Sequence, residues 1–154
     1  MINFVLMMNK QGKIRLSKFY VTMSQADQTR VIRQAFALAS TRNEKFANFC
    51  RLQKRETVLV YKRYVGLYVI MGVDRGDNEH LAAAAIHFFV ELLDKYFGTV
   101  RELDLIYEFE SCYRILDEFI FAGEVYCEDK QAIVDRIHAF ERAVKKSKRE
   151  HKRR

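Results

Sequence analysis

The stretch LVYKRYVGLYVIMGVD, residues 59–74, constrains the fold more than any other part of the chain. From Tyr64 to Val73 every position is apolar or glycine, so side chains of both parities are hydrophobic. Successive side chains of a strand point to opposite faces, and a strand with one wet face alternates apolar and polar residues. The stretch therefore predicts a strand inside a sheet that is covered on both faces.

Several other segments have the β-branched, aromatic and alternating residues that are typical of strands. The five expected strands are 2–8, 13–23, 46–52, 57–61 and 64–73. Turns are expected at NKQG, residues 9–12, and at QKRE, residues 53–56, because these residues favour tight chain reversals. The runs follow one another closely, which favours antiparallel pairing.

Segments with helical periodicity lie between these strands and after them. Ser24, with an acidic residue three positions later, begins a helix over residues 24–42. Asn78 begins a long helix that ends at Phe97 and is apolar almost all round. A helix of this kind needs partners on more than one side.

Three further helices are expected at 102–109, 112–123 and from Asp129 to 144. The order of the segments predicts an α+β fold. We expect a five-stranded antiparallel sheet flanked by helices on both faces, with additional C-terminal helices. Residues 1–144 should form one domain, since neither a linker nor an internal repeat interrupts them.

The net charge of +7 is concentrated at one end of the chain of 154 residues. The last ten residues, KKSKREHKRR, hold seven Lys/Arg and one Glu, which leaves 20 cations and 19 anions in residues 1–144. We therefore expect residues 145–154 to be a basic, disordered tail. A basic stripe across a folded face would favour nucleic acid, and this sequence does not predict one.

Motifs for catalysis and cofactor binding are scarce. The six glycines form neither a dinucleotide fingerprint nor a phosphate-binding loop. His80 and His87 share the long helix, but no third metal ligand is spaced for them. Cys50, Cys112 and Cys127 lack C-x-x-C spacing and are interpreted as reduced thiols. We expect no enzyme activity, cofactor or metal.

The sequence also lacks the features of a membrane-spanning or secreted chain. It has no apolar run of about 18 residues, and its opening segment is not followed by a small-residue cleavage site. These observations predict a soluble, intracellular protein.

Four blocks of the sequence stand in an order typical of one family. They are MINFVLMMNKQGKIRLSKFY, LVYKRYVGLYV, DNEHLAAAAIHFFVELLDKYFG and ELDLIYEFESCYRILDEFIFAGEV. Leu59, Val60, Tyr61 and Lys62 match two aliphatics, Tyr and a base, and Leu67-Tyr68-Val69 follows where the family has L-Y-F. The blocks resemble the sigma, or small, chain of heterotetrameric clathrin adaptor complexes over nearly all of residues 1–140.

The resemblance implies a longin-like fold and a non-catalytic subunit in vesicle-mediated intracellular protein transport. Its partners would be a gamma-, alpha- or epsilon-type large chain, bound tightly, and a beta-type large chain and a medium chain within the same complex. The location would be cytoplasmic, on Golgi, trans-Golgi, endosomal or plasma-membrane coated vesicles. Membrane contact would come through the complex, aided by the basic tail.

In this family the small chain also receives cargo tails that carry an acidic dileucine signal, [DE]-x-x-x-L-[LI]. Carried over position by position, the leucine pocket falls on Val65, Leu67, Val90, Thr99, Val100, Leu103 and Leu105. Arg15 would face the acidic residue together with the large chain. By pattern alone Val65 and Leu67 are core residues, so their pocket role follows only from the resemblance.

Alternatives and departures stay open at this point. The QKRE turn is longer than is usual in the family, and the tail extends past the usual end. Residues 102–125 are closer to the trans-Golgi and plasma-membrane types, whereas openings like MNKQGK also occur in a non-clathrin type. Another longin-like coat subunit, such as the zeta chain of coatomer, would keep the fold without dileucine binding. A nucleic-acid module built on the tail is a further alternative.

Overall fold

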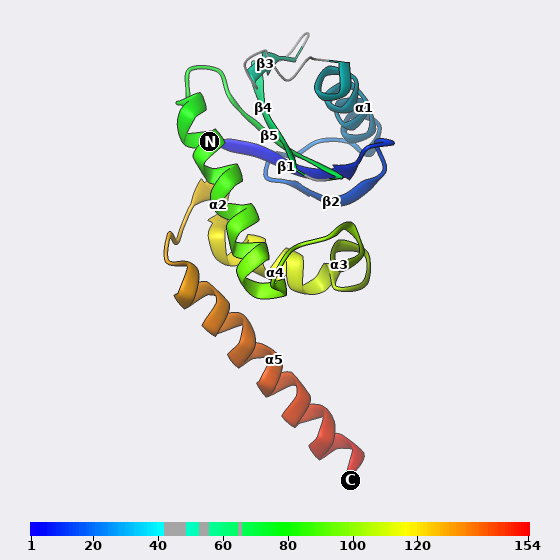
Figure 1. Cartoon of the computed structure of the whole chain (residues 1–154), viewed down its shortest axis with the longest axis vertical. Coiled ribbons are helices and arrows are strands. Elements are labelled where there is room, and N and C mark those ends of the chain that lie inside the picture. Colours follow the sequence, from blue (N-terminus) through cyan, green and yellow to red (C-terminus); the bar gives the residue numbers. More distant parts are fainter. Residues whose placement is uncertain (42–48, 53–55, 65) are drawn as a thin grey trace.

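The computed structural model describes residues 1–41, 49–52, 56–64 and 66–154. Along the chain, two strands and a helix are followed by three strands, three helices, a short two-stranded hairpin and a last helix. Figure 1 shows their arrangement. The elements are β1 (Ile2–Asn9), β2 (Ile14–Phe19), α1 (Gln25–Thr41), β3 (Phe49–Arg51), β4 (Thr57–Tyr64), β5 (Leu67–Asp74), α2 (Glu79–Phe97), α3 (Glu102–Tyr107), α4 (Phe109–Phe119), β6 (Ile120–Phe121), β7 (Glu124–Val125) and α5 (Lys130–Lys152).

Five strands form one antiparallel sheet in the order β2-β1-β5-β4-β3. The strand β5 lies in the middle and pairs with β1 on one side and with β4 on the other. Only its last residue, Asp74, is exposed. This confirms the prediction that residues from the opening stretch form an inner strand that is covered on both faces.

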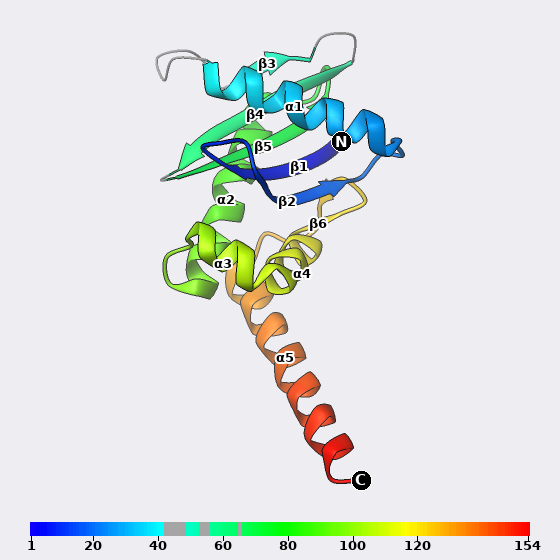
Figure 2. The same ribbon diagram turned by 90° about the vertical axis from the view of Figure 1, so that its right-hand side faces the viewer.

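The two faces of the sheet belong to two separate apolar clusters. Leu67, Val69 and Met71 pack with residues of α2 and of the C-terminal helices. Tyr68 and Ile70 point the other way and pack with residues of α1. In Figure 2 the helix α1 crosses one face of the sheet and α2 lies behind the other. The expected α+β arrangement with helices on both faces is confirmed.

The long helix α2 has the caps that the sequence predicts. The side chain of Asn78 accepts hydrogen bonds from the backbone N–H groups of His80 and Leu81, at 3.0 and 3.4 Å. At the other end Gly98 has φ +91°, a left-handed value that favours glycine. The helix places seven buried residues on its inner side, whereas Leu81 stays exposed.

The boundary between β4 and β5 differs from the prediction. Residues 62–64 continue β4, which we expected to end at Tyr61, and β5 begins at Leu67 rather than at Tyr64. Lys62 pairs with Val69 and Tyr64 pairs with Leu67, so the two strands form one long hairpin. Cationic side chains fit here because this end of β4 is partly exposed.

A second correction concerns the helix that we expected to run through Gly123. The helix α4 ends at Phe119, and β6 and β7 follow as a short hairpin. Ala122 and Gly123 both have positive φ, at 51° and 83°, as two-residue hairpin turns of type I′ require. The carbonyl of Gly123 accepts a hydrogen bond of 2.7 Å from Ile2 N–H, which docks the hairpin against the start of β1.

Other boundaries agree within a few residues. The structure ends β2 at Phe19, where we expected the strand to continue to residue 23. It ends α3 at Tyr107, where we expected the helix to reach 109. The predicted strand residues 46–48 and most of the QKRE turn, residues 53–55, lie outside the described residues.

The last helix, α5, is capped by Asp129, whose side chain accepts a hydrogen bond of 3.0 Å from Ala132 N–H. In its first turns Ile133, Val134 and Ile137 are buried, but every side chain from residue 145 to 154 is exposed. We expected these residues to be disordered, and the structure instead continues the helix to Lys152 (Figures 1 and 2). Lys, Arg and Glu are good helix formers, and cations in a last turn suit the helix dipole. Among the described residues, no helix has both the length and the hydrophobicity needed to cross a bilayer.

Candidate functional site

Most residues of the predicted leucine pocket meet on one side of the sheet. Leu67 begins β5, Val90 lies in the second half of α2, and Leu105 is the buried residue of α3. All three belong to the same apolar cluster, and Val100 packs against it. Val65 lies outside the described residues.

The predicted pocket residues differ sharply in their exposure. Leu67, Val90 and Leu105 are buried, whereas Thr99 is exposed and Leu103 is 52% exposed. The short helix α3 thus turns Leu105 inward and Leu103 outward. Through Leu105 and Val100, α3 and the loop before it pack against the cluster that holds these buried side chains.

Carboxylates hold the loop between α2 and α3 in place. Asp94 accepts a hydrogen bond of 2.8 Å from Val100 N–H, and Asp104 accepts one of 2.9 Å from Arg101 N–H. The backbone beside Thr99 and Val100 is therefore positioned by side chains of both helices that flank it.

Arg15 lies next to this group on β2, and its side chain is 19% exposed. Its Nε lies 2.9 Å from Oε1 of Glu102, the first residue of α3. The same oxygen accepts a hydrogen bond of 3.0 Å from Nδ2 of Asn9. These contacts join the β1–β2 hairpin to α3 across 87 residues of sequence.

The hydrogen bond from Arg15 lowers the pKa of the Glu102 carboxyl below its usual value, and the hydrogen bond from Asn9 adds to the effect. The charge of Lys13 acts in the same direction. Glu102 is therefore ionised at neutral pH, and the predicted cargo-binding cation already has an internal acid. Our sequence reasoning did not identify Glu102, because nothing in the spacing relates it to Arg15.

Several side chains that could bind a metal or act as a nucleophile are instead engaged in contacts within the fold. His80 makes an edge contact with the ring of Phe49, and His87 pairs with Glu91 on the next turn of α2. Burial raises the pKa of the Cys112 thiol to about 12, so it stays protonated. Within the described part of the chain, no three His, Cys, Asp or Glu side chains gather to hold a metal ion.

The chain is similar to known proteins along almost its whole length. The family model of the clathrin adaptor complex small chain matches residues 1–144. The AP-2 complex subunit sigma of Schizosaccharomyces pombe is 46% identical over 143 residues, covering 92% of this chain and 99% of that protein. The AP-1 complex subunit sigma-1 of Arabidopsis thaliana is 42% identical over 150 residues, covering 97% and 92%. The human AP-1 complex subunit sigma-3 is 42% identical, covering 89% and 88%.

The structure of the chain is also similar to that of a chain in a known adaptor complex. A chain in a homology model of the full-length AP-3 complex in a stretched open conformation is 28% identical and superposes with a TM-score of 0.74, covering 97% of this chain and 99% of that chain. The similar proteins belong to AP-1, AP-2 and AP-3 complexes. Fold, family model and relatives agree that this longin-like chain belongs to the clathrin adaptor complex small-chain family.

Proposed function

We propose that this sigma-type adaptor subunit binds acidic dileucine signals, [DE]-x-x-x-L-[LI], in the cytoplasmic tails of membrane cargo. One observation supports the proposal above all others. Leu67, Val90 and Leu105 belong to one apolar cluster, and Arg15 pairs with Glu102 on α3, the same short helix that contributes Leu105 to the cluster. A signal made of one acid and two leucines needs this combination of chemistry.

The two parts of the site should contribute unequally. Burying a leucine side chain contributes roughly 1.5 to 3 kcal/mol, so two leucines supply most of the affinity of a short peptide. A partly exposed Arg–carboxylate contact adds about 1 kcal/mol or less. The two leucines therefore provide most of the binding free energy, and the acidic residue adds a smaller part.

Binding requires a local rearrangement in this chain. The inner pocket residues are buried, so the leucines can enter only if α3 or the loop before it shifts. The helix α3 suits such a movement, because it has six residues and buries only Leu105. An incoming acid would also compete with Glu102 for Arg15.

The assembly partners follow from the family. Members are subunits of adaptor complexes, so the chain is a coat component and not an enzyme. We infer tight packing on a gamma-, alpha- or epsilon-type large chain, with a beta-type large chain and a medium chain in the same complex. The complex would act on the cytoplasmic face of Golgi, trans-Golgi, endosomal or plasma membranes.

The test is binding of a fluorescent peptide with an acidic dileucine signal to the assembled complex. Leu103→Asp places a charge at the exposed edge of the site, and Val90→Asp places one inside it. Both should reduce binding at least tenfold, because the carboxylate must be desolvated against the incoming leucines. Arg15→Glu should reduce it less, and more at low salt than at high salt.

Val144→Asp on α5 is the matched control and should bind like wild type. Tyrosine-based peptides should bind every variant equally. If Leu103→Asp and Val90→Asp both assemble and bind the dileucine peptide normally, the chain is a structural subunit without a cargo pocket, as a coatomer zeta-like subunit would be.

A further inference from the structure

The end of α5 projects from the folded domain and carries most of the net charge of the chain (Figure 1). Residues 145–154 hold seven Lys/Arg and one Glu, and all of their side chains are exposed. Because the helix continues to Lys152, the positions of these cations relative to one another are fixed by helical geometry. The charge is therefore displayed on a defined surface.

Four of the cations form a stripe along one side of this helix. Lys145, Lys148, Arg149 and Lys152 occupy positions i, i+3, i+4 and i+7, which share one face. Glu150 follows Lys148 by two positions and so points to the opposite side. The stripe is therefore a continuous row of positive charge, which we call the basic stripe.

Contacts with α2 fix the direction in which α5 leaves the domain. Near the start of α5, the ammonium group of Lys130 lies 5.0 Å from the centroid of the Phe88 ring. Further along, the ring of His138 stacks on that of Tyr96 with centroids 5.2 Å apart. Both helices advance in the same direction between these contacts. Since α2 ends at Phe97, α5 leaves the domain at the C-terminal end of α2.

A polar cluster anchors α5 just before the basic stripe begins. The hydroxyl of Tyr96 donates a hydrogen bond to Oε1 of Glu141, and the hydroxyl of Ser111 donates one of 3.0 Å to the same oxygen. Burial raises the pKa of Tyr96 to about 12, so this hydroxyl stays protonated. Lys152 lies about 16 Å beyond Glu141, at a rise of about 1.5 Å per residue. The helix therefore projects from a base that α2 and α4 hold in place.

The predicted cargo site lies at this same end of α2. Thr99 follows Gly98, which ends the helix, and Leu103 is exposed on α3 shortly after it. A dileucine signal belongs to a tail that begins at the membrane, so a site that binds it works close to a bilayer. The basic stripe therefore projects at the end of the molecule where that bilayer would lie.

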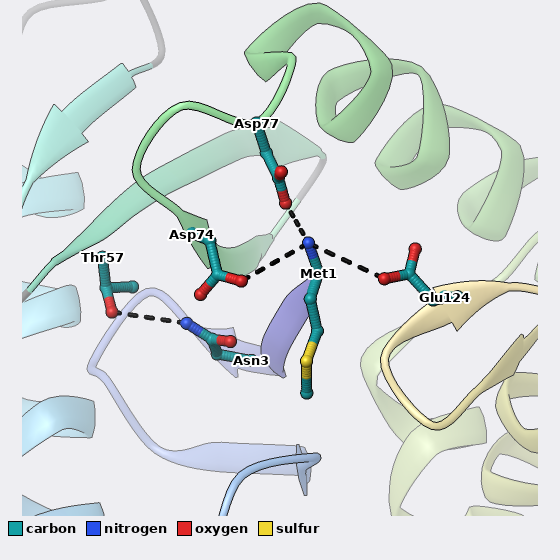
Figure 3. A network of polar contacts seen from close by, with 6 residues as sticks. All are labelled: Met1, Asn3, Thr57, Asp74, Asp77 and Glu124. Carbon is teal, nitrogen blue, oxygen red and sulfur yellow. Dashed lines mark hydrogen bonds and ion pairs between the residues drawn. The ribbon is translucent and has the colours of Figure 1, made fainter.

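The other end of α2 is acidic. The Met1 ammonium group pairs with Asp77 and lies 3.6 Å from Asp74 and 3.8 Å from Glu124 (Figure 3). One cation faces three carboxylates, so this end keeps a negative charge. Asp77 directly precedes Asn78, the N-cap of α2. A negatively charged surface would repel this end and attract the basic stripe, which turns the predicted cargo site toward that surface.

We propose that the basic stripe of α5 binds anionic phospholipid of the membrane that holds the cargo. Lys and Arg close to a bilayer with phosphatidylserine are attracted to its negative surface potential. A bilayer is favoured over nucleic acid because the stripe stands beside a site for the tails of membrane proteins. This lipid contact deepens the proposed function and rests on it for that choice of partner.

The experiment measures co-sedimentation of the assembled complex with cargo-free vesicles. One set is four parts phosphatidylcholine to one part phosphatidylserine, and the other is phosphatidylcholine alone. The double variant Lys148→Glu, Lys152→Glu reverses two charges of the basic stripe, and Glu is also a good helix former. It should reduce binding to the phosphatidylserine vesicles at least tenfold, and the difference should shrink as salt is raised. Binding to phosphatidylcholine vesicles should not change.

The double variant Arg30→Glu, Arg33→Glu is the matched control. It changes the net charge equally, at exposed positions of α1, which packs on the other face of the sheet. This control should bind the phosphatidylserine vesicles like wild type. A soluble dileucine peptide, measured without vesicles, should bind wild type and both double variants with the same affinity.

The outcomes separate the lipid contact from the proposed cargo site. If wild type does not bind the soluble peptide, the cargo site fails, and the cargo-free vesicles still test the lipid contact. Equal binding of the two double variants to the phosphatidylserine vesicles would show that the basic stripe is not the contact. If the Lys148→Glu, Lys152→Glu variant loses the soluble peptide, the stripe binds an acidic peptide instead. If wild type binds single-stranded RNA and not these vesicles, the partner is nucleic acid and the lipid contact is wrong.

Discussion

Glu102 decides how much Arg15 can contribute to recognition of a cargo acid. Its carboxylate accepts hydrogen bonds from Arg15 and Asn9, so the cation already has a partner before any peptide arrives. A peptide acid must replace or share that partner. The net binding free energy that a peptide acid contributes is therefore smaller than its contact with Arg15 alone would supply.

Replacing Glu102 with Gln should change this balance. In the assembled complex we compare a peptide with Glu at the acidic position with one that has Gln there. Wild type should prefer the acidic peptide only slightly, whereas Glu102→Gln should increase the preference about three- to fivefold, because about 1 kcal/mol of ion-pair energy becomes available.

The ratio of the two affinities is informative even if the variant loosens α3, since that would affect both peptides alike. Glu108→Gln, also at an exposed position near α3, serves as the control. A drop in affinity of Glu102→Gln for both peptides, with an unchanged ratio, would show that Glu102 positions α3 or Arg15 and does not compete.

The two halves of α5 have different surroundings. The first half of α5 packs against the body through Ile133, Val134 and Ile137, whereas its last turns contact nothing that the structure describes. In both overall views the helix extends alone beyond the domain (Figures 1 and 2). Its cations therefore stay available for a negatively charged surface.

Deleting residues 145–154 should weaken binding of the assembled complex to vesicles that contain phosphatidylserine. Each cation near such a surface adds about 1 kcal/mol, so even partial engagement predicts a loss of tenfold or more, measured by co-sedimentation. Binding to phosphatidylcholine vesicles and the melting temperature should not change, because the deleted side chains are all exposed. Equal binding of both complexes to the anionic vesicles would leave the tail with a solubilising role only.

Eight large hydrophobic side chains are exposed among the residues that the structure describes. One group lies around Leu81 and the β6–β7 hairpin, and a second includes Leu103, Tyr107 and Phe109 on α3 and α4. Soluble monomers rarely expose large contiguous apolar patches. The group around Leu81 is what a subunit of a permanent assembly would present to a neighbour, whereas Leu103 belongs to the proposed cargo site.

We therefore expect the isolated chain to self-associate and the co-expressed complex to be monodisperse. Size-exclusion chromatography with light scattering measures both states. A stable monomer of the isolated chain with no affinity for any adaptor large chain would contradict this expectation.

Local sequence patterns were enough to predict the layers of the fold. The two-sided hydrophobicity of residues 67–73 requires cover on both faces, and the capping residues Asn78 and Asp129 place two helix starts, because both signals depend on near neighbours in the chain. Boundaries were less well predicted. The end of β4 and the β6–β7 hairpin depend on which strand or chain end lies opposite, and periodicity does not contain that information.

The candidate site also combines features that the sequence predicted with features that only the folded structure revealed. The resemblance to the small-chain family, and not residue type, named the apolar pocket group, and Leu67, Val90, Val100 and Leu105 lie in or against one large cluster. Their accessibility, the pairing of Arg15 with Glu102 and the acidic cluster at the start of α2 emerged only from the folded chain. Each of these depends on side chains that are far apart in sequence and meet only when helices pack on the sheet, so tertiary packing, and not local propensity, decided them.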